Sequence, residues 1–260
     1  MKKFLYDSFA ERWGKFDQIF LYGDPHFSDE ESYQLRGLLN IPSEYEKGSR
    51  EYELYLKARI DYLDELQIKS INAKAGKNTL LIITGDVGNI ECIKKLKAGY
   101  KVLIMGNHDK GASNYKRQVF FNENFNETRF YGQLDRRHIS SNSYKELEDL
   151  GCTNIKEGHP IIEEDNHLFD EVYEGPLMIS DRLMISHEPL FPTVSFIYNI
   201  HSHVHNSNYK GDEHHLNVIA EANDYTPVAL YPLLKKGLLK NIDSIHRETI
   251  DKATARKGRK

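Results

Sequence analysis

Three short apolar runs in the first half of the chain each end at a glycine. They are residues 19–22 before Gly23, residues 80–84 before Gly85 and residues 102–105 before Gly106. Continuous apolar runs of this length are typical of strands buried on both faces. Between the first two runs, apolar residues recur at helical spacing over residues 43–71, which predicts a helix. A second helix is predicted at residues 89–97, between the second and third runs. The pattern therefore predicts a β-α-β-α-β unit.

The second half of the chain has a different pattern. Residues 111–160 are polar and irregular, with one short helix predicted at residues 144–150. Strands are then predicted at residues 168–173, 177–179, 183–186, 194–200 and 215–220. The Ser180-Asp181 pair suits a tight turn, so we expect a hairpin-rich second sheet. A helix is predicted from residue 241, followed by the basic tail ARKGRK, for which we expect a solvated surface role.

These elements predict an α/β fold in which two sheets form a β-sandwich flanked by helices. We expect one domain over residues 1–260. It would carry loop or helical insertions at about residues 29–75 and 111–165 and a C-terminal helix with its basic tail at about residues 241–260. With no domain linker and no internal repeat in view, a single core is the simplest interpretation.

Composition narrows the class of protein. The chain has 260 residues, 39% of them hydrophobic and 28% charged, which is typical of a folded protein. Its net charge of −4 gives no overall attraction to nucleic acid or to an anionic membrane. No run reaches the roughly 18 to 20 apolar residues of a membrane-spanning helix, and the N-terminus lacks the apolar core of a signal peptide. We expect a cytoplasmic protein with no membrane partner, while the oligomeric state stays open.

Polar clusters follow each of the three N-terminal strands. Asp24 and His26 follow the first, Asp86 the second, and Asn107, His108 and Asp109 the third. The carboxyl ends of parallel strands meet at one edge of a sheet, so these side chains should lie together. Carboxylates brought close to one another need a cation or a proton between them. The sequence therefore predicts a metal site at the carboxyl edge of the strands.

The second half supplies more residues of the same ligand type. His187 follows the predicted strand at residues 183–186, and His201, His203 and His205 follow the strand at residues 194–200. In an extended segment alternate residues share one face, so any adjacent pair of these three histidines could hold one site. Each motif is weak alone, but five such clusters in this order, each at a strand end, are not expected by coincidence.

The ordered clusters resemble the signature of the calcineurin-like metallophosphoesterase superfamily, particularly its bacterial and phage members. That signature runs DxH, GDxxN or a variant, GNHD, a lone His and GHxH, and the match spans residues 18 to about 206. The resemblance implies a four-layer fold with two metal ions. It assigns the first metal to Asp24, His26 and the last His of the final motif.

The same resemblance assigns the second metal to Asn107, His187 and the first His of the final motif, with Asp86 bridging the two ions. It also implies that His108 faces the substrate as an acid or charge stabiliser and that Asp109 orients His108.

The final motif can be read in two registers. One places Ile200 and the other places Ser202 where the family has Gly. Since Ser is the nearer replacement for Gly, we predict that His203 and His205 are the ligands and that His201 is a pocket residue outside the ligand set. A Ser in place of Gly predicts a slightly altered backbone at that turn.

A ligand set of nitrogen and oxygen without thiolate suits Mn, Fe or Zn, and Mn is favoured. Two such cations bridged by Asp86 would provide a hydroxide that attacks phosphorus. The predicted function is hydrolysis of a phosphomonoester or phosphodiester, including a nucleotide. A nuclease of the same superfamily acting on DNA or RNA is the alternative. A scaffold without catalysis is least favoured, because such a protein would be expected to lose ligands or His108.

The substrate is not readable from the sequence, because it depends on loops such as residues 29–48 and 111–160. Four basic residues in or next to these loops could reach a phosphate: Arg36, Lys110, Arg136 and Arg137. Charged residues are mostly exposed, so a surface role is predicted for each of them.

Overall fold

The computed structural model describes residues 4–109, 168–191, 197–205 and 208–243. It also describes two antiparallel strand pairs, β4 (Val119–Phe120) with β5 (Arg129–Phe130) and β6 (Ile155–Lys156) with β7 (His159–Pro160). The helix expected at residues 144–150 lies outside the described residues. So does the expected C-terminal helix beyond residue 243, together with the basic tail.

The first sheet has the order β13-β1-β2-β3-β8. Its strands are β13 (Val228–Ala229), β1 (Gln18–Tyr22), β2 (Thr79–Ile83), β3 (Tyr100–Ile104) and β8 (Glu171–Tyr173). All neighbours pair in parallel except β13, which is antiparallel to β1. Tyr22 pairs with Ile83, and Ile83 pairs with Leu103, so the carboxyl ends of β1, β2 and β3 are level. The three N-terminal strands are confirmed.

The second sheet has the order β12-β11-β10-β9. Its strands are β12 (His215–Asn217), β11 (Tyr198–His201), β10 (Leu183–Ile185) and β9 (Leu177–Met178). The expectation of a hairpin-rich second sheet was wrong, because β10, β11 and β12 are parallel. Among the described strands of this sheet, only β9 and β10 form a hairpin. The strand expected at residues 168–173 is β8 and belongs to the first sheet. The pattern of apolar residues identifies a buried strand, but it does not identify the strand with which it pairs.

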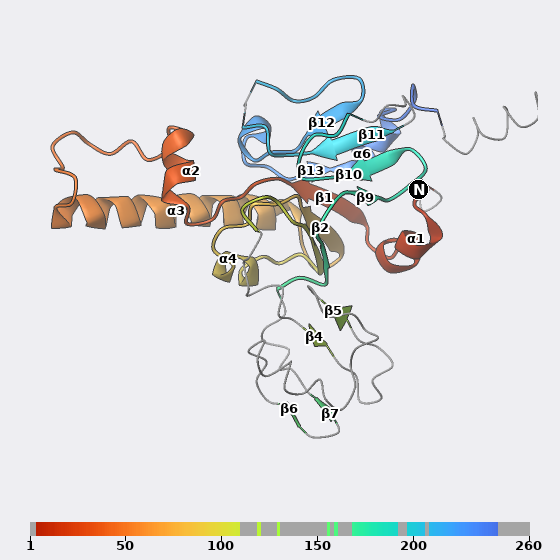
Figure 1. The fold of residues 1–260 in the computed structure, drawn as a ribbon, viewed down its shortest axis with the longest axis horizontal. Coiled ribbons are helices and arrows are strands. Elements are labelled where there is room, and N and C mark those ends of the chain that lie inside the picture. Colours follow the sequence, from red (N-terminus) through yellow and green to blue (C-terminus); the bar gives the residue numbers. More distant parts are fainter. Residues whose placement is uncertain are drawn as a thin grey trace, which may run out of the picture.

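Alternation along β1 shows how the layers pack. Ile19 and Leu21 point into the core between the two sheets, where they meet residues of β10 and β11 such as Ile185. Phe20 and Tyr22 point to the opposite face, which the C-terminal part of α3 (Arg50–Lys74) and α4 (Glu91–Lys94) cover. The predicted fold class is confirmed as two mixed sheets flanked by helices (Figure 1). Strands buried on both faces explain the unbroken apolar runs.

The helices differ from the sequence prediction at their ends. α3 begins at Arg50 rather than residue 43, because the Ser49 hydroxyl caps it by accepting from the Tyr52 amide at 3.1 Å. α4 covers only part of the predicted residues 89–97. The segment predicted as a loop at residues 29–48 contains α2 (Glu30–Leu35), capped by Asp29. α1 (Asp7–Trp13) and α6 (Leu230–Lys235) pack at the core between the sheets.

Helix α2 and the N-terminal part of α3 project from the sheets, and we call them the α2–α3 arm (Figure 1). A separate small core of Tyr33, Leu39, Leu56 and Leu63 holds the arm together. In the described part of the chain, no helix combines the length and the apolar character needed to span a membrane.

Buried polar residues of α3 hold the loop that follows β1. The Asp64 carboxylate accepts from the Ser28 amide at 2.9 Å, from the Ser28 hydroxyl at 2.6 Å and from the Tyr33 hydroxyl at 2.5 Å. Gln67 donates to the carbonyl of Pro25 at 3.0 Å and accepts from Tyr22 at 2.7 Å. Since this loop carries Asp24 and His26, α3 positions one wall of the predicted metal site.

We expect Asp64→Ala to lower the free energy of unfolding by about 3 kcal/mol, because three donors lose their acceptor: the buried Tyr33 hydroxyl and the amide and hydroxyl of Ser28. A buried donor left unsatisfied costs about 1–3 kcal/mol. Urea unfolding would measure the change. Asp61→Ala is the matched control on the same helix, since its side chain is 59% exposed and forms an ion pair with the exposed Lys57. A loss no larger than that of the control would contradict the anchoring role of Asp64.

Candidate metal centre

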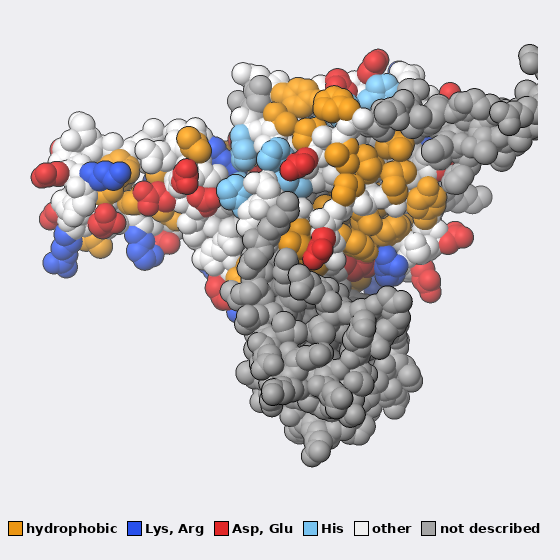
Figure 2. Space-filling view, in the orientation of Figure 1, with side chains coloured by type: hydrophobic (Ala, Val, Ile, Leu, Met, Phe, Trp, Pro, Cys, Tyr) orange, Lys and Arg blue, Asp and Glu red, His pale blue; other side chains and the backbone are white. Residues whose placement is uncertain are grey.

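The loops after five strands meet at one edge of the molecule. Figure 2 shows His side chains gathered on the surface between the α2–α3 arm and the two sheets. Backbone hydrogen bonds join the loops: Gly23 donates to Val218 at 2.9 Å, His26 to Asp86 at 2.9 Å, and Ser202 to His187 at 2.9 Å. The structure brings all seven predicted ligand residues to this edge: Asp24, His26, Asp86, Asn107, His187, His203 and His205.

One group of side chains lies beside β1. The His205 Nε2 atom is 3.7 Å from Asp24 Oδ2, and the rings of His26 and His205 are 5.4 Å apart. His203 donates its backbone N–H to the same Asp24 oxygen at 2.7 Å. Asp24 and His26 are buried, whereas His205 is at the surface.

A second group lies beside β2 and β3. The His187 Nε2 atom is 2.8 Å from Asn107 Oδ1 and 3.0 Å from His203 Nδ1. Potential ligand atoms of Asp86, His187 and His203 all lie within 4.8 Å of one another. Ligand atoms about 2 Å from one ion are separated by about 3 Å, so these separations suit atoms that share a cation.

Asp86 stands between the two groups. Its Oδ2 atom is 3.5 Å from Nε2 of His26 and 3.5 Å from Nε2 of His187. Its Oδ1 atom accepts from the backbone N–H of His108 at 2.9 Å. One carboxylate oxygen is thus fixed by the backbone, and the other faces histidines of both groups.

Three histidines are fixed through Nδ1. His26 Nδ1 is 2.8 Å from Asp29 Oδ2, His187 Nδ1 is 2.9 Å from the Thr84 carbonyl, and His205 Nδ1 is 2.6 Å from Glu221 Oε1. Carboxylate and carbonyl oxygens only accept, so each Nδ1 carries the hydrogen. Each neutral ring then presents the lone pair of Nε2 to the centre, which is the arrangement of histidines that bind metals.

Two features test whether the residues fit a cation. The His26 Nε2 atom is buried and has no hydrogen-bond partner among the described residues. The neutral His187 ring would direct its Nε2 lone pair at the Asn107 oxygen 2.8 Å away, which is repulsive unless a proton or a cation lies between them. Both features are satisfied by a divalent ion with imidazole and oxygen ligands, so the residues fit a metal.

The electrostatics of the centre favour positive charge. Burial lowers the pKa of His187, but the hydrogen bond to Asp24 and the charges of Asp24 and Asp86 raise it by more, to about 9. Burial raises the pKa of Asp86, while the nearby His26 ring, the positive charge of His187 and the hydrogen bond from the His108 amide lower it to about 2. The carboxylates that would hold a proton on His187 would also hold a metal ion.

Backbone strain is concentrated at the centre. Asp24, His26, Asp86 and His203 all have positive φ angles, at 48°, 44°, 48° and 64°. Such conformations are unfavourable for residues other than Gly and persist where the surroundings enforce them, commonly at functional sites. Gly106 has a different role, because a Cβ there would lie 2.1 Å from Asp86 Oδ1.

His108 and Asp109 occupy different places. The His108 ring is exposed at the rim, 5.3 Å from the His26 ring. The buried Asp109 carboxylate accepts backbone hydrogen bonds from Asp86 at 2.9 Å, Val87 at 3.1 Å and Gly106 at 2.8 Å. Asp109 therefore joins the loop after β2 to the loop after β3. The sequence did not indicate this structural role.

In the final histidine motif, His203 and His205 lie toward the centre, and His201 lies away from it. His201 is fully buried on β11, with Nδ1 2.8 Å from the Ser202 carbonyl and its ring 6.0 Å from that of Tyr209. The Ser202 hydroxyl lies 3.0 Å from Asp24 Oδ1 and 2.5 Å from the Thr84 carbonyl.

The Ser in place of Gly is accommodated by the glycine opposite it. A Cβ on Gly23 would meet the Ser202 Cβ at 2.5 Å, so Gly23 supplies the space that Ser202 occupies. His203, the next residue, has a positive φ of 64°.

The sequence analysis did not identify two residues of the site, Asp29 and Glu221. A surface role was predicted for Arg36, but this was wrong, because its side chain is only 5% exposed. Arg36 donates to the Asp24 carbonyl at 3.0 Å and pairs with Glu221 at 3.6 Å. The helix-cap pattern after Asp29 was a usable signal, whereas nothing local marks Arg36 or Glu221. Lys110, Arg136 and Arg137 lie outside the described residues.

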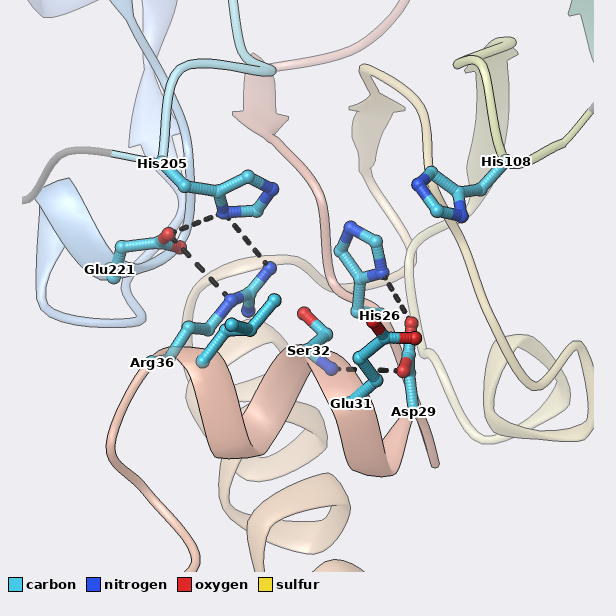
Figure 3. Close-up of a pocket in the computed structure, with 9 residues that line it drawn as sticks. His26, Asp29, Glu31, Ser32, Arg36, His108, His205 and Glu221 are labelled. Atoms are coloured by element: carbon cyan, nitrogen blue, oxygen red, sulfur yellow. Dashed lines mark hydrogen bonds and ion pairs between the residues drawn. The ribbon is translucent and has the colours of Figure 1, made fainter.

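A cleft of about 600 Å³ opens beside the first group, between α2 and the loops. Figure 3 shows His26, His108 and His205 around it, with Arg36 and residues of α2 opposite. This volume is within the usual range of small-molecule sites, about 300–1,000 Å³. A bound molecule in the cleft would contact both the predicted ligands and His108.

No curated protein matches this chain significantly. The crystal structure of a protein of unknown function, AQ665 from Aquifex aeolicus, is similar over 84% of this chain and 98% of that chain, with 18% sequence identity and a TM-score of 0.44. The sequence profile of the calcineurin-like phosphoesterases matches residues 18–231, which contain the whole centre. The chain therefore belongs to the calcineurin-like phosphoesterase family.

Proposed function

We propose that this protein is a two-metal-dependent phosphoesterase that hydrolyses a phosphomonoester or phosphodiester. The observation that carries the proposal is the Asp86 oxygen 3.5 Å from Nε2 of both His26 and His187, between two groups of inward-facing ligands. Asp24, His26 and His205 would hold the first cation and Asn107, His187 and His203 the second, with Asp86 shared by both. Mn is the favoured metal, with Fe or Zn as alternatives.

Two divalent cations would supply a water molecule of lowered pKa and would neutralise charge on the phosphate oxygens. Protein side chains and backbone would orient the metal ligands and supply the proton. Asp29, Thr84 and Glu221 keep three imidazoles in the tautomer with Nε2 inward. His108, exposed at the rim of the cleft, would donate a proton to the departing oxygen of the substrate.

Nucleic acid is the second candidate substrate. The described part of the cleft includes three carboxylates, those of Asp29, Glu31 and Glu221, and one guanidinium, that of Arg36, which is already paired with Glu221. A long polyanion gains little from such a surface, whereas a small phosphate ester needs only the cations and His108. We therefore favour a small-molecule substrate.

Chelation should abolish hydrolysis, and added Mn should restore it, because the attacking water depends on the cations. The measurement is release of nitrophenol or phosphate from model monoesters and diesters before and after exhaustive dialysis against EDTA. Metal content would be determined on the same samples. Full activity in a sample shown to be free of metal would exclude this mechanism.

The register of the final motif is tested by metal content. We expect His203→Ala and His205→Ala each to lower the bound metal below two ions per chain. His201→Ala should retain two ions and instead lower the melting temperature, because it leaves a cavity at a fully buried position. If only His201→Ala lost a metal, the other register would hold.

His108→Asn should leave both metals bound and slow turnover of substrates with poor leaving groups by about 10²- to 10⁴-fold, the usual contribution of a positioned general acid. A nitrophenyl ester should be affected less, because nitrophenolate departs without a proton. The kcat values of an alkyl ester and a nitrophenyl ester would be compared. Equal losses on both would indicate charge stabilisation rather than proton donation, and loss of a metal would make His108 a ligand.

A further inference from the structure

Glu221 begins the short 3-10 helix η4 (Glu221–Asn223), which follows β12 and belongs to no predicted motif. Its Oε1 atom is 2.6 Å from His205 Nδ1 and 3.6 Å from Arg36 Nε. Figure 3 shows the three side chains in contact at one wall of the cleft. Two segments far apart in sequence, α2 and η4, therefore meet at one histidine ring.

The chemistry of the donors fixes the His205 ring. A carboxylate only accepts, so the short contact with Glu221 requires the hydrogen on His205 Nδ1. Arg36 Nη2 lies 3.4 Å from the same nitrogen but only donates, so it cannot bond to a protonated Nδ1. The lone pair is consequently on Nε2, which faces Asp24 at 3.7 Å.

His205 depends on this contact more than the other two histidines fixed through Nδ1 do. The His205 side chain is 38% exposed, whereas those of His26 and His187 are packed on all sides. Packing limits rotation of the two buried rings, but an exposed ring is held mainly by its hydrogen bonds. Glu221 is therefore the main restraint on the orientation of His205 in the described structure.

Glu221 is itself held firmly. Its side chain is only 12% exposed and lies against the Arg36 guanidinium. The η4 segment is anchored to the chain that precedes it, because the side-chain amide of Asn223 donates to the carbonyls of Asn217 at 3.0 Å and Ile219 at 2.9 Å. Ala220, just before η4, donates to Gly23 at 3.0 Å, next to Asp24. The carboxylate is thus fixed relative to the predicted ligands.

We propose that Glu221 is a positioning residue that keeps His205 Nε2 directed at the first metal site, with Arg36 holding the Glu221 carboxylate in place. The second site does not use this pair, since His187 is fixed by the Thr84 carbonyl. The inference rests on the proposed two-metal function. It predicts that the first site alone loses affinity when Glu221 is changed.

The test is titration of the metal-free, full-length protein with Mn by calorimetry, with metal content measured afterwards. Glu221→Ala should weaken the first site by about 10- to 100-fold, the usual effect of removing a partner of a ligating histidine, and leave the second unchanged. Glu221→Gln keeps an accepting oxygen without the charge and should weaken the first site by a smaller but measurable factor. Glu213→Ala, at a side chain that is 85% exposed, is the matched control and should match the wild type.

Three results would overturn the proposal: unchanged affinity at both sites in Glu221→Ala, equal weakening of both sites in a folded variant, or unchanged affinity in Glu221→Gln. Circular dichroism would check folding, and the Gln variant decides the matter if the Ala variant unfolds. A wild-type protein that binds no Mn would contradict the proposed function instead. If the wild-type protein binds two Mn ions, the proposed function stands even when the Glu221 variants show no effect.

A second measurement needs no variant. In the Zn-loaded protein, which is diamagnetic, nitrogen NMR of the His205 ring should show hydrogen on Nδ1. A hydrogen on Nε2 would contradict the proposal directly.

Discussion

Asp86 places a carboxylate, almost wholly buried, between the imidazoles of His26 and His187, with one oxygen 3.5 Å from each. A buried charge of this kind is unfavourable unless cations or hydrogen-bond donors surround it. The neighbouring loops provide imidazoles and backbone amides around this carboxylate. The His108 amide fixes the second oxygen, and Gly106 leaves room for it. The level carboxyl ends of the parallel strands bring these groups to one edge.

The strained loops of the centre are supported from outside it. Asp24, His26 and Asp86 have positive φ angles, which only a firm surrounding structure can maintain. Asp64 and Gln67 of α3 hold the first loop, and Asp109 ties the second loop to the third. The long helix therefore fixes the backbone of the loop that carries the predicted ligands Asp24 and His26.

The two halves of the centre are supported differently. His187 is buried and held by a backbone carbonyl, so its orientation follows from the fold itself. His205 is at the surface and relies on the carboxylate of Glu221, which Arg36 and η4 hold in turn. Glu221 and Arg36 also line the cleft.

The sequence by itself determined the three parallel strands, the family and the residues that gather at the strand ends, because buried strands and the clusters after them are local patterns. It favoured His203 and His205 over His201, and the structure places them accordingly. The pairing of β8, the extent of α2 and α3, and the roles of Asp29, Arg36 and Glu221 emerged only in the tertiary structure. These features arise from contacts between segments distant in sequence, because Arg36 and Glu221 become buried beside His205 only when the chain folds.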